Sequence, residues 1–77
     1  MPRAFILINV GTGSGDNVLK QLKNISAVEG AYASFGLYDI IVKIKVATME
    51  ELKEIVSHKI RVINQVLSTL TLIAMDE

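Results

Sequence analysis

The chain has 77 residues, no cysteine, one histidine and a formal net charge of zero, and 51% of its residues are hydrophobic. This length predicts one domain, residues 1–77, which buries only about 60% of its unfolded surface, so we expect self-association to add stability. The missing cysteines exclude disulfides and thiolate metal sites, and the balanced charge does not favour a nucleic-acid-binding face.

The chain carries no targeting or membrane signal. No apolar run approaches the roughly 20 residues needed to cross a membrane. Residues 1–8 lack the small-residue cleavage site of a signal peptide and lead directly into a predicted strand. These features predict a cytoplasmic protein, and no residue cluster indicates a metal or another cofactor.

The first third predicts a strand, a glycine-rich connection and a helix. Residues 4–10 are an apolar run of strand length. The Gly-Thr-Gly-Ser-Gly run at 11–15 matches neither a P-loop nor a dinucleotide fingerprint, so we interpret it as a flexible connection. Val18, Leu22 and Ile25 then recur at helical spacing behind Ser14 or Asp16, either of which can cap a helix.

The middle of the chain predicts a β-hairpin. Residues 28–35 and 40–46 are apolar runs, and Gly36-Leu37-Tyr38-Asp39 between them is the predicted turn. A phenol and a carboxylate therefore lie together where the chain reverses, and loops held by a scaffold often carry binding groups. Without further information, Asp39 could equally be a turn residue that bonds local backbone, and Tyr38 a packing residue.

The last third predicts a second helix and a fourth strand. Thr48 and Glu51 match a capping box. Apolar residues then follow at near-helical spacing, and residues 65–75 form the predicted strand, in which threonines alternate with leucines. The helix positions are Leu52, Ile55, Val56 and Ile60, and the strand positions are Thr69, Leu70, Thr71 and Leu72.

The element order β-α-β-β-α-β predicts a ferredoxin-like α+β fold, a four-stranded antiparallel sheet with both helices on one face. The first and third strands would be central. Phe5, Leu7 and Ile41 fall on the face that two helices cannot cover. Since an exposed apolar patch of this kind marks an interface, we expect two sheets to pack face to face in a dimer.

Several segments resemble the C-terminal effector domain of Lrp/AsnC regulators, called RAM for regulation of amino acid metabolism. The most specific are Gly36-Leu-Tyr-Asp-Ile-Ile-Val-Lys43 and Ser68-Thr-Leu-Thr-Leu-Ile73, and the resemblance extends from Ala4 to about Met75. It implies a non-enzymatic, transcription-regulating domain that dimerises through its sheets. It further implies rings, often octamers, with a free amino acid bound between dimers.

The resemblance also implies the ligand-binding residues: Gly36, Leu37, Tyr38, Asp39, Thr69, Thr71 and Leu72. The chain departs from the family at Phe35, where a small polar residue is common, and at Gln65, where glycine is common. The usual helix-turn-helix domain does not precede the first strand, so we expect a stand-alone sensor. Such a sensor would act through assembly or through a full-length Lrp/AsnC partner and not through direct contact with DNA.

Three other interpretations stay open, of which the simplest is a scaffold that only mediates association with a full-length relative. A small enzyme of the dimeric α+β barrel type would use His58, Asn9 and Tyr32 as polar groups in a cavity within one protomer. An ACT-type amino-acid-binding module has a similar topology, and its sheets join edge to edge. A groove between dimers would favour the sensor over the enzyme, and a side-by-side dimer would support the ACT-type module.

Overall fold

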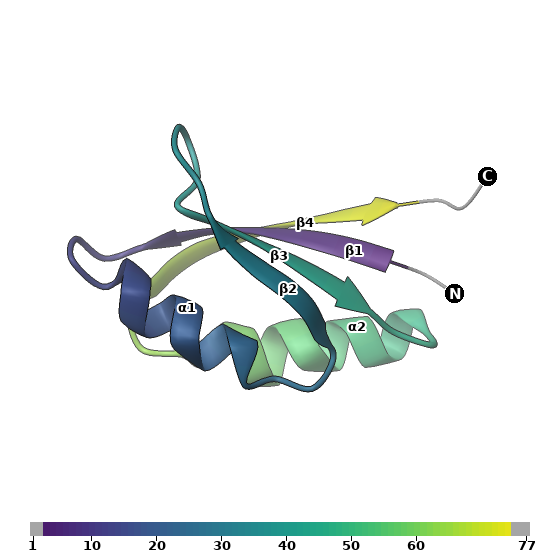
Figure 1. The fold of residues 1–77 in the computed structure, drawn as a ribbon. Helices are drawn as coiled ribbons and strands as arrows, with labels where there is room; N and C mark the ends of the chain where they lie inside the picture. The colour runs from purple at the N-terminus through teal and green to yellow at the C-terminus, as the bar shows by residue number, and fades with distance from the viewer. Residues whose placement is uncertain (1–2, 75–77) are drawn as a thin grey trace.

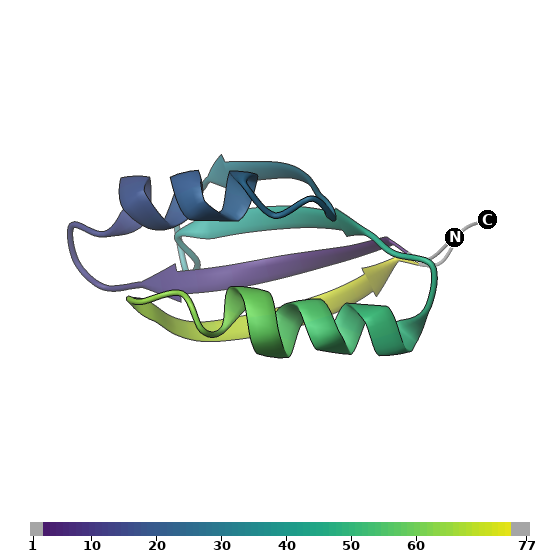
Figure 2. The same cartoon turned by 90° about the horizontal axis from the view of Figure 1, so that it is seen from below.

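The computed structural model describes residues 3–74. Four antiparallel strands form one sheet in the order β2-β3-β1-β4, so the first and third strands are central, as predicted. Both helices lie on the same face of this sheet (Figures 1 and 2), which confirms the ferredoxin-like fold. The elements are β1 (Arg3–Val10), α1 (Gly15–Lys23), β2 (Val28–Ala33), β3 (Ile40–Lys45), α2 (Met49–Ile55), the π-helical turn η1 (Val56–Ile60) and β4 (Val66–Ala74).

The strand boundaries differ from the prediction mainly at the hairpin. The strand β2 ends at Ala33 and not at Phe35, so the connection to β3 has six residues, 34–39, instead of four. The strand β4 begins at Val66 and not at Gln65, and its expected end at Met75 lies outside the described residues. The hairpin loop therefore includes Ser34 and Phe35.

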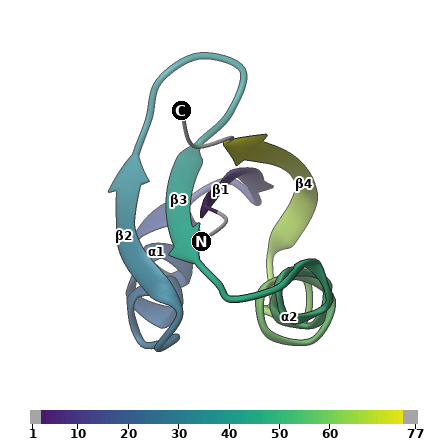
Figure 3. The ribbon, with the colours of Figure 1, turned by 90° about the vertical axis from the view of Figure 1, so that its right-hand side faces the viewer.

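The core lies between the sheet and the two helices. Successive strand side chains point to opposite faces, so alternate residues of β1 and β3 are fully buried while their neighbours are not. Figure 3 shows α1 below β2 and β3, and α2 on the side of β4. The buried core consists of Ala4, Ile6, Ile8, Val18, Leu22, Ala31, Ile40, Val42, Ile44, Val46, Leu52, Ile55 and Ile60.

The second helix begins as predicted and then departs from α-helical geometry. Thr48 Oγ1 accepts a hydrogen bond of 3.1 Å from the backbone N–H of Glu51, which confirms the N-cap. A regular α-helix would place Lys59 one turn beyond Ile55, on the buried face. The π turn inserts one residue, and the Arg61 N–H donates to the Val56 carbonyl over 2.9 Å. Ile60 is therefore buried, and Lys59 is exposed.

Both helices are short. The α-helical part of α1 has nine residues and that of α2 has seven. Within residues 3–74, neither helix has the length and apolar character that a membrane span requires. The N-cap of α1 is Ser14, whose side chain makes no capping hydrogen bond there. The position of α1 thus depends mainly on its buried Val18 and Leu22.

The chain enters β4 through a strained residue. Gln65 has a φ of 76°, in the left-handed region that favours glycine. Its carbonyl accepts a hydrogen bond of 3.0 Å from the Gly11 N–H. Its side chain lies against Gly11, where an added Cβ would come within 3.2 Å of the Gln65 Cδ. Gly11 therefore provides the room that Gln65 needs.

Candidate functional site

The loop formed by residues 34–39 projects from the sheet on the side opposite the helices (Figure 1). The Ser34 N–H donates to the Asp39 carbonyl over 2.8 Å and closes the loop at its base. Gly36 has a φ of 117°, a conformation that residues with a Cβ rarely adopt. Phe35 and Leu37 are 102% and 88% exposed. Two apolar side chains thus stand in solvent at the tip of an ordered loop.

Asp39 fastens this loop to the end of β1. Its backbone N–H donates to the Ile8 carbonyl over 2.9 Å, just beyond the last paired residues, Ile8 and Ile40. Its Oδ2 accepts a hydrogen bond of 2.9 Å from the Val10 N–H. The carboxylate thus bonds the β1 backbone just beyond the point where pairing with β3 ends. Within residues 3–74 its other oxygen, Oδ1, accepts no hydrogen bond. The Asp39 carboxylate thus bonds a neighbouring strand, whereas its backbone carbonyl closes its own loop through Ser34.

The predicted ligand residues do not all meet within one chain. Thr69 pairs with Ile8 and lies across β1 from the loop base, two strand spacings or about 10 Å from β3. Thr71 pairs with Ile6 one step further away, on the helix-covered face with Thr69. Leu72 pairs with Phe5 and faces the other way. A site that used all seven residues would therefore combine surfaces from more than one copy.

The sheet face opposite the helices, called here the open face, carries an apolar patch. Leu70 and Leu72 of β4 are 43% and 48% exposed, although they lie beside Leu7 and Phe5 of β1. Ile41 of β3 pairs with Leu7 from the other side. Five apolar side chains thus form a continuous surface across three strands. The sequence predicted Phe5, Leu7 and Ile41 on this face, and the structure confirms their placement.

Tyr32 also belongs to the open face, although the sequence pattern suggested it only as a cavity group. It is 59% exposed, and its ring folds back over Gly30. A Cβ on Gly30 would lie 2.8 Å from the Tyr32 Cζ, so only glycine leaves room for the ring in this position. The signal in the sequence was the spacing of two residues, which puts Gly30 and Tyr32 on the same strand face.

The polar groups suggested for an enzyme do not converge. His58 lies on η1 and is paired with Glu54 at 3.8 Å, with both side chains about two-thirds exposed. Asn9 lies on β1, where its Nδ2 donates to Ser68 Oγ over 3.2 Å. Tyr32 lies on the open face of β2. In the part of the chain that the structure describes, no three His, Cys, Asp or Glu side chains are placed to hold a metal ion.

A ferredoxin-like sheet with one helix-covered face, one open apolar face and a projecting hairpin loop defines the fold of this small α+β domain. The family model for the Lrp/AsnC ligand binding domain matches residues 3–77, so the chain belongs to this family. The family is regulatory. This match confirms the resemblance that the hairpin and last-strand motifs indicated.

Similar proteins include both single domains and longer regulators. The regulatory protein AsnC of Haemophilus influenzae is 37% identical over 61 residues, which is 79% of this chain. The chain spans only 41% of the length of that relative. The solved structure of hypothetical protein PHS023 from Pyrococcus horikoshii is 35% identical, with a TM-score of 0.92 over 100% of this chain and 93% of that one.

A more distant structure shares the fold. It is a complex of a transcriptional regulator from Neisseria meningitidis with L-Met, 14% identical to this chain, with a TM-score of 0.88. The alignment covers 99% of this chain and 51% of that regulator. At this identity the likeness concerns the fold alone.

Proposed function

We propose that this protein is a non-enzymatic regulatory domain that dimerises through the open face and binds a free amino acid beside the 34–39 loop, between dimers. Four observations support the proposal: membership of the Lrp/AsnC ligand-binding family, the apolar open face, the projecting loop and the L-Met complex of the distant regulator. The observation that carries it is the Asp39 carboxylate, which is held by Val10 through one oxygen, while its other oxygen has no hydrogen-bond donor among residues 3–74.

The chemistry of the loop suits an amino acid. A ligand ammonium needs acceptors, and these could be the second oxygen of Asp39 on the loop and, from another chain, the hydroxyl of Thr69 on the helix-covered face. Backbone N–H groups around Gly36 can bind the ligand carboxylate. Because the loop groups of one chain are exposed to solvent, a second dimer would have to close the site. The proposed site comprises Gly36, Leu37, Tyr38, Asp39, Thr69, Thr71 and Leu72 from more than one chain.

In this proposal Phe35 influences which ligands fit the closed site. Its ring is fully exposed, so it closes no pocket within its own chain. In an assembly it would meet a neighbouring copy directly beside the proposed ligand, and there it would restrict the size of side chain that fits. In this proposal, ligand binding shifts the equilibrium between dimers and larger rings such as octamers, or the affinity for a full-length regulator. The ligand must therefore bind the favoured assembly more tightly.

Calorimetric titration with each of the twenty amino acids tests the proposal, together with measurement of particle mass in the presence and absence of ligand. We expect at least one amino acid to bind and to change the mass distribution. Asp39→Asn keeps an acceptor for the Val10 N–H but removes the charge, and we expect it to weaken binding about tenfold or more. Absence of binding by all twenty, or equal binding by Asp39→Asn, would refute the proposed site.

A further inference from the structure

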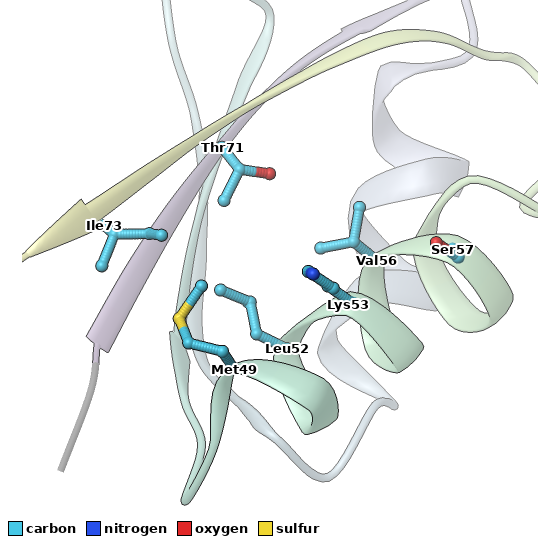
Figure 4. A pocket seen from close by; sticks show the side chains of 7 residues that line it. All are labelled: Met49, Leu52, Lys53, Val56, Ser57, Thr71 and Ile73. Atoms are coloured by element: carbon cyan, nitrogen blue, oxygen red, sulfur yellow. The ribbon is translucent and has the colours of Figure 1, made fainter.

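A cavity of about 250 Å³ opens between α2 and β4, on the helix-covered side of the sheet (Figure 4). Its β4 wall lies beside Ala4 and Ile6 of β1, whereas the 34–39 loop meets β1 at Ile8 and Val10. The cavity and the loop are therefore at opposite ends and on opposite faces of the sheet. The cavity is lined by Met49, Leu52, Lys53, Val56, Ser57, Thr71 and Ile73.

The cavity has a structural origin in the edge strand. Ala31, Val42, Ile6 and Thr71 form one row across the sheet, and the first three are fully buried. Thr71, at the end of this row, is only half-buried beneath α2. Its short side chain fills less of the space under the helix than an isoleucine would. The resulting volume is therefore bounded by the strand on one side and by the helix on the other.

The lining combines apolar walls with one kind of charge. Met49, Leu52, Val56 and Ile73 provide aliphatic and thioether surface, and Lys53 lies between Leu52 and Val56 on the helix wall (Figure 4). Hydroxyls come from Ser57 of the π turn and from Thr71 of β4. No acidic residue is among the lining residues. Within residues 3–74, no carboxylate lies within 4.0 Å of the Lys53 ammonium.

We propose that this cavity binds a small aliphatic carboxylate. The ligand's hydrocarbon body would contact Leu52, Val56 and Ile73, and its carboxylate would accept hydrogen bonds from the Lys53 ammonium and from one of the two hydroxyls. A volume of about 250 Å³ lies just below the roughly 300–1,000 Å³ of typical small-molecule pockets, so it suits a small ligand. An amino acid fits less well, because its ammonium would lie near Lys53 and the lining contributed by residues 3–74 contains no acidic side chain. This inference does not rest on the proposed amino-acid site, although Thr71 belongs to both sets of residues.

The probe for the test is 4-methylpentanoate, which has an aliphatic body, one carboxylate and no ammonium. Titration is followed by the NMR signals of the side-chain methyl groups. We expect saturable shifts at Leu52, Val56 and Ile73. Lys53→Met, which keeps the apolar stem, should weaken binding of the carboxylate about tenfold or more, while binding of the neutral 4-methylpentanamide stays within about twofold. Lys59→Met, on the same helical segment but outside the cavity, is the matched control and should bind as the parent does.

Three results would overturn the inference. The first is an absence of methyl shifts at millimolar probe. The second is equal weakening by Lys53→Met and Lys59→Met. The third is a set of shifts that follow protein concentration and not probe concentration, which would identify the cavity as a contact between copies. Asp39→Ala separates this inference from the proposed function, since it should remove amino-acid binding at the loop and leave 4-methylpentanoate binding unchanged.

Discussion

Replacing both Leu70 and Leu72 by glutamate should dissociate the dimer, which in our proposal forms through the open face. The two side chains are 43% and 48% exposed in the single chain, so each has roughly half of its surface left to bury. Complete burial of a leucine side chain contributes about 1.5–3 kcal/mol, so half contributes roughly 1 kcal/mol. Two leucines from each of two protomers then stabilise the dimer by about 4 kcal/mol. At 1.4 kcal/mol for each factor of ten, the dissociation constant should rise about a thousandfold.

Sedimentation equilibrium over a range of protein concentrations measures this change directly. The matched control is Val62→Glu, because Val62 is also apolar and 65% exposed but follows the π turn away from the sheet. We expect the control to keep the parent's association and the double variant to sediment at the mass of one chain. Circular dichroism establishes that both variants keep their secondary structure. If the double variant and the parent associate with equal strength, the open face is not the interface.

Three further predictions concern stability, measured by urea or thermal unfolding. Asp39→Ala removes the acceptor of the Val10 N–H and should cost about 1 kcal/mol, whereas Asp39→Asn retains an acceptor and should cost less; equal losses would show that this hydrogen bond does not stabilise the fold. Gln65→Gly relieves the left-handed backbone at a φ of 76° and should raise stability by up to about 1 kcal/mol, or roughly 4–8 °C in Tm, and a fall in Tm would contradict the strain argument. Deletion of His58 should convert the π turn to α-helix and leave Ile60 on the buried face, so the variant should fold with a similar Tm; failure to fold would show that the π turn is needed.

The sequence pattern predicted the strands, the helices and their order, because the apolar residues follow the side-chain period of a strand or that of a helix. Alternation in residues 40–46 and helical spacing in the first helix each specify which side chains are buried. The same pattern left Phe5, Leu7 and Ile41 on the open face, where the structure places them. The N-cap could also be predicted locally, since Thr48 and Glu51 are three residues apart and the Glu51 N–H donates to the Thr48 hydroxyl.

Other features depend on contacts between distant residues, and the pattern did not show them. The hairpin loop is two residues longer than predicted, because β2 stops pairing at Ala33. The Asp39 carboxylate bonds Val10, which is 29 residues away in the chain. The π turn was also missed, because the five-residue spacing of Ile55 and Ile60 is close enough to the α-helical period to be interpreted as part of one stripe.

The seven predicted ligand residues illustrate the division between sequence and structure most clearly. The sequence by itself determined the fold class and the excess of apolar sheet surface. Its hairpin and last-strand motifs also indicated the family. Each of these depends on local pattern and composition. Only the tertiary structure decided that Thr69 and Thr71 face the helices while Leu72 faces the open side. It also decided that Asp39 keeps one oxygen unbonded among residues 3–74. Strand register sets both facts, because a shift of one residue would exchange the two faces of β4.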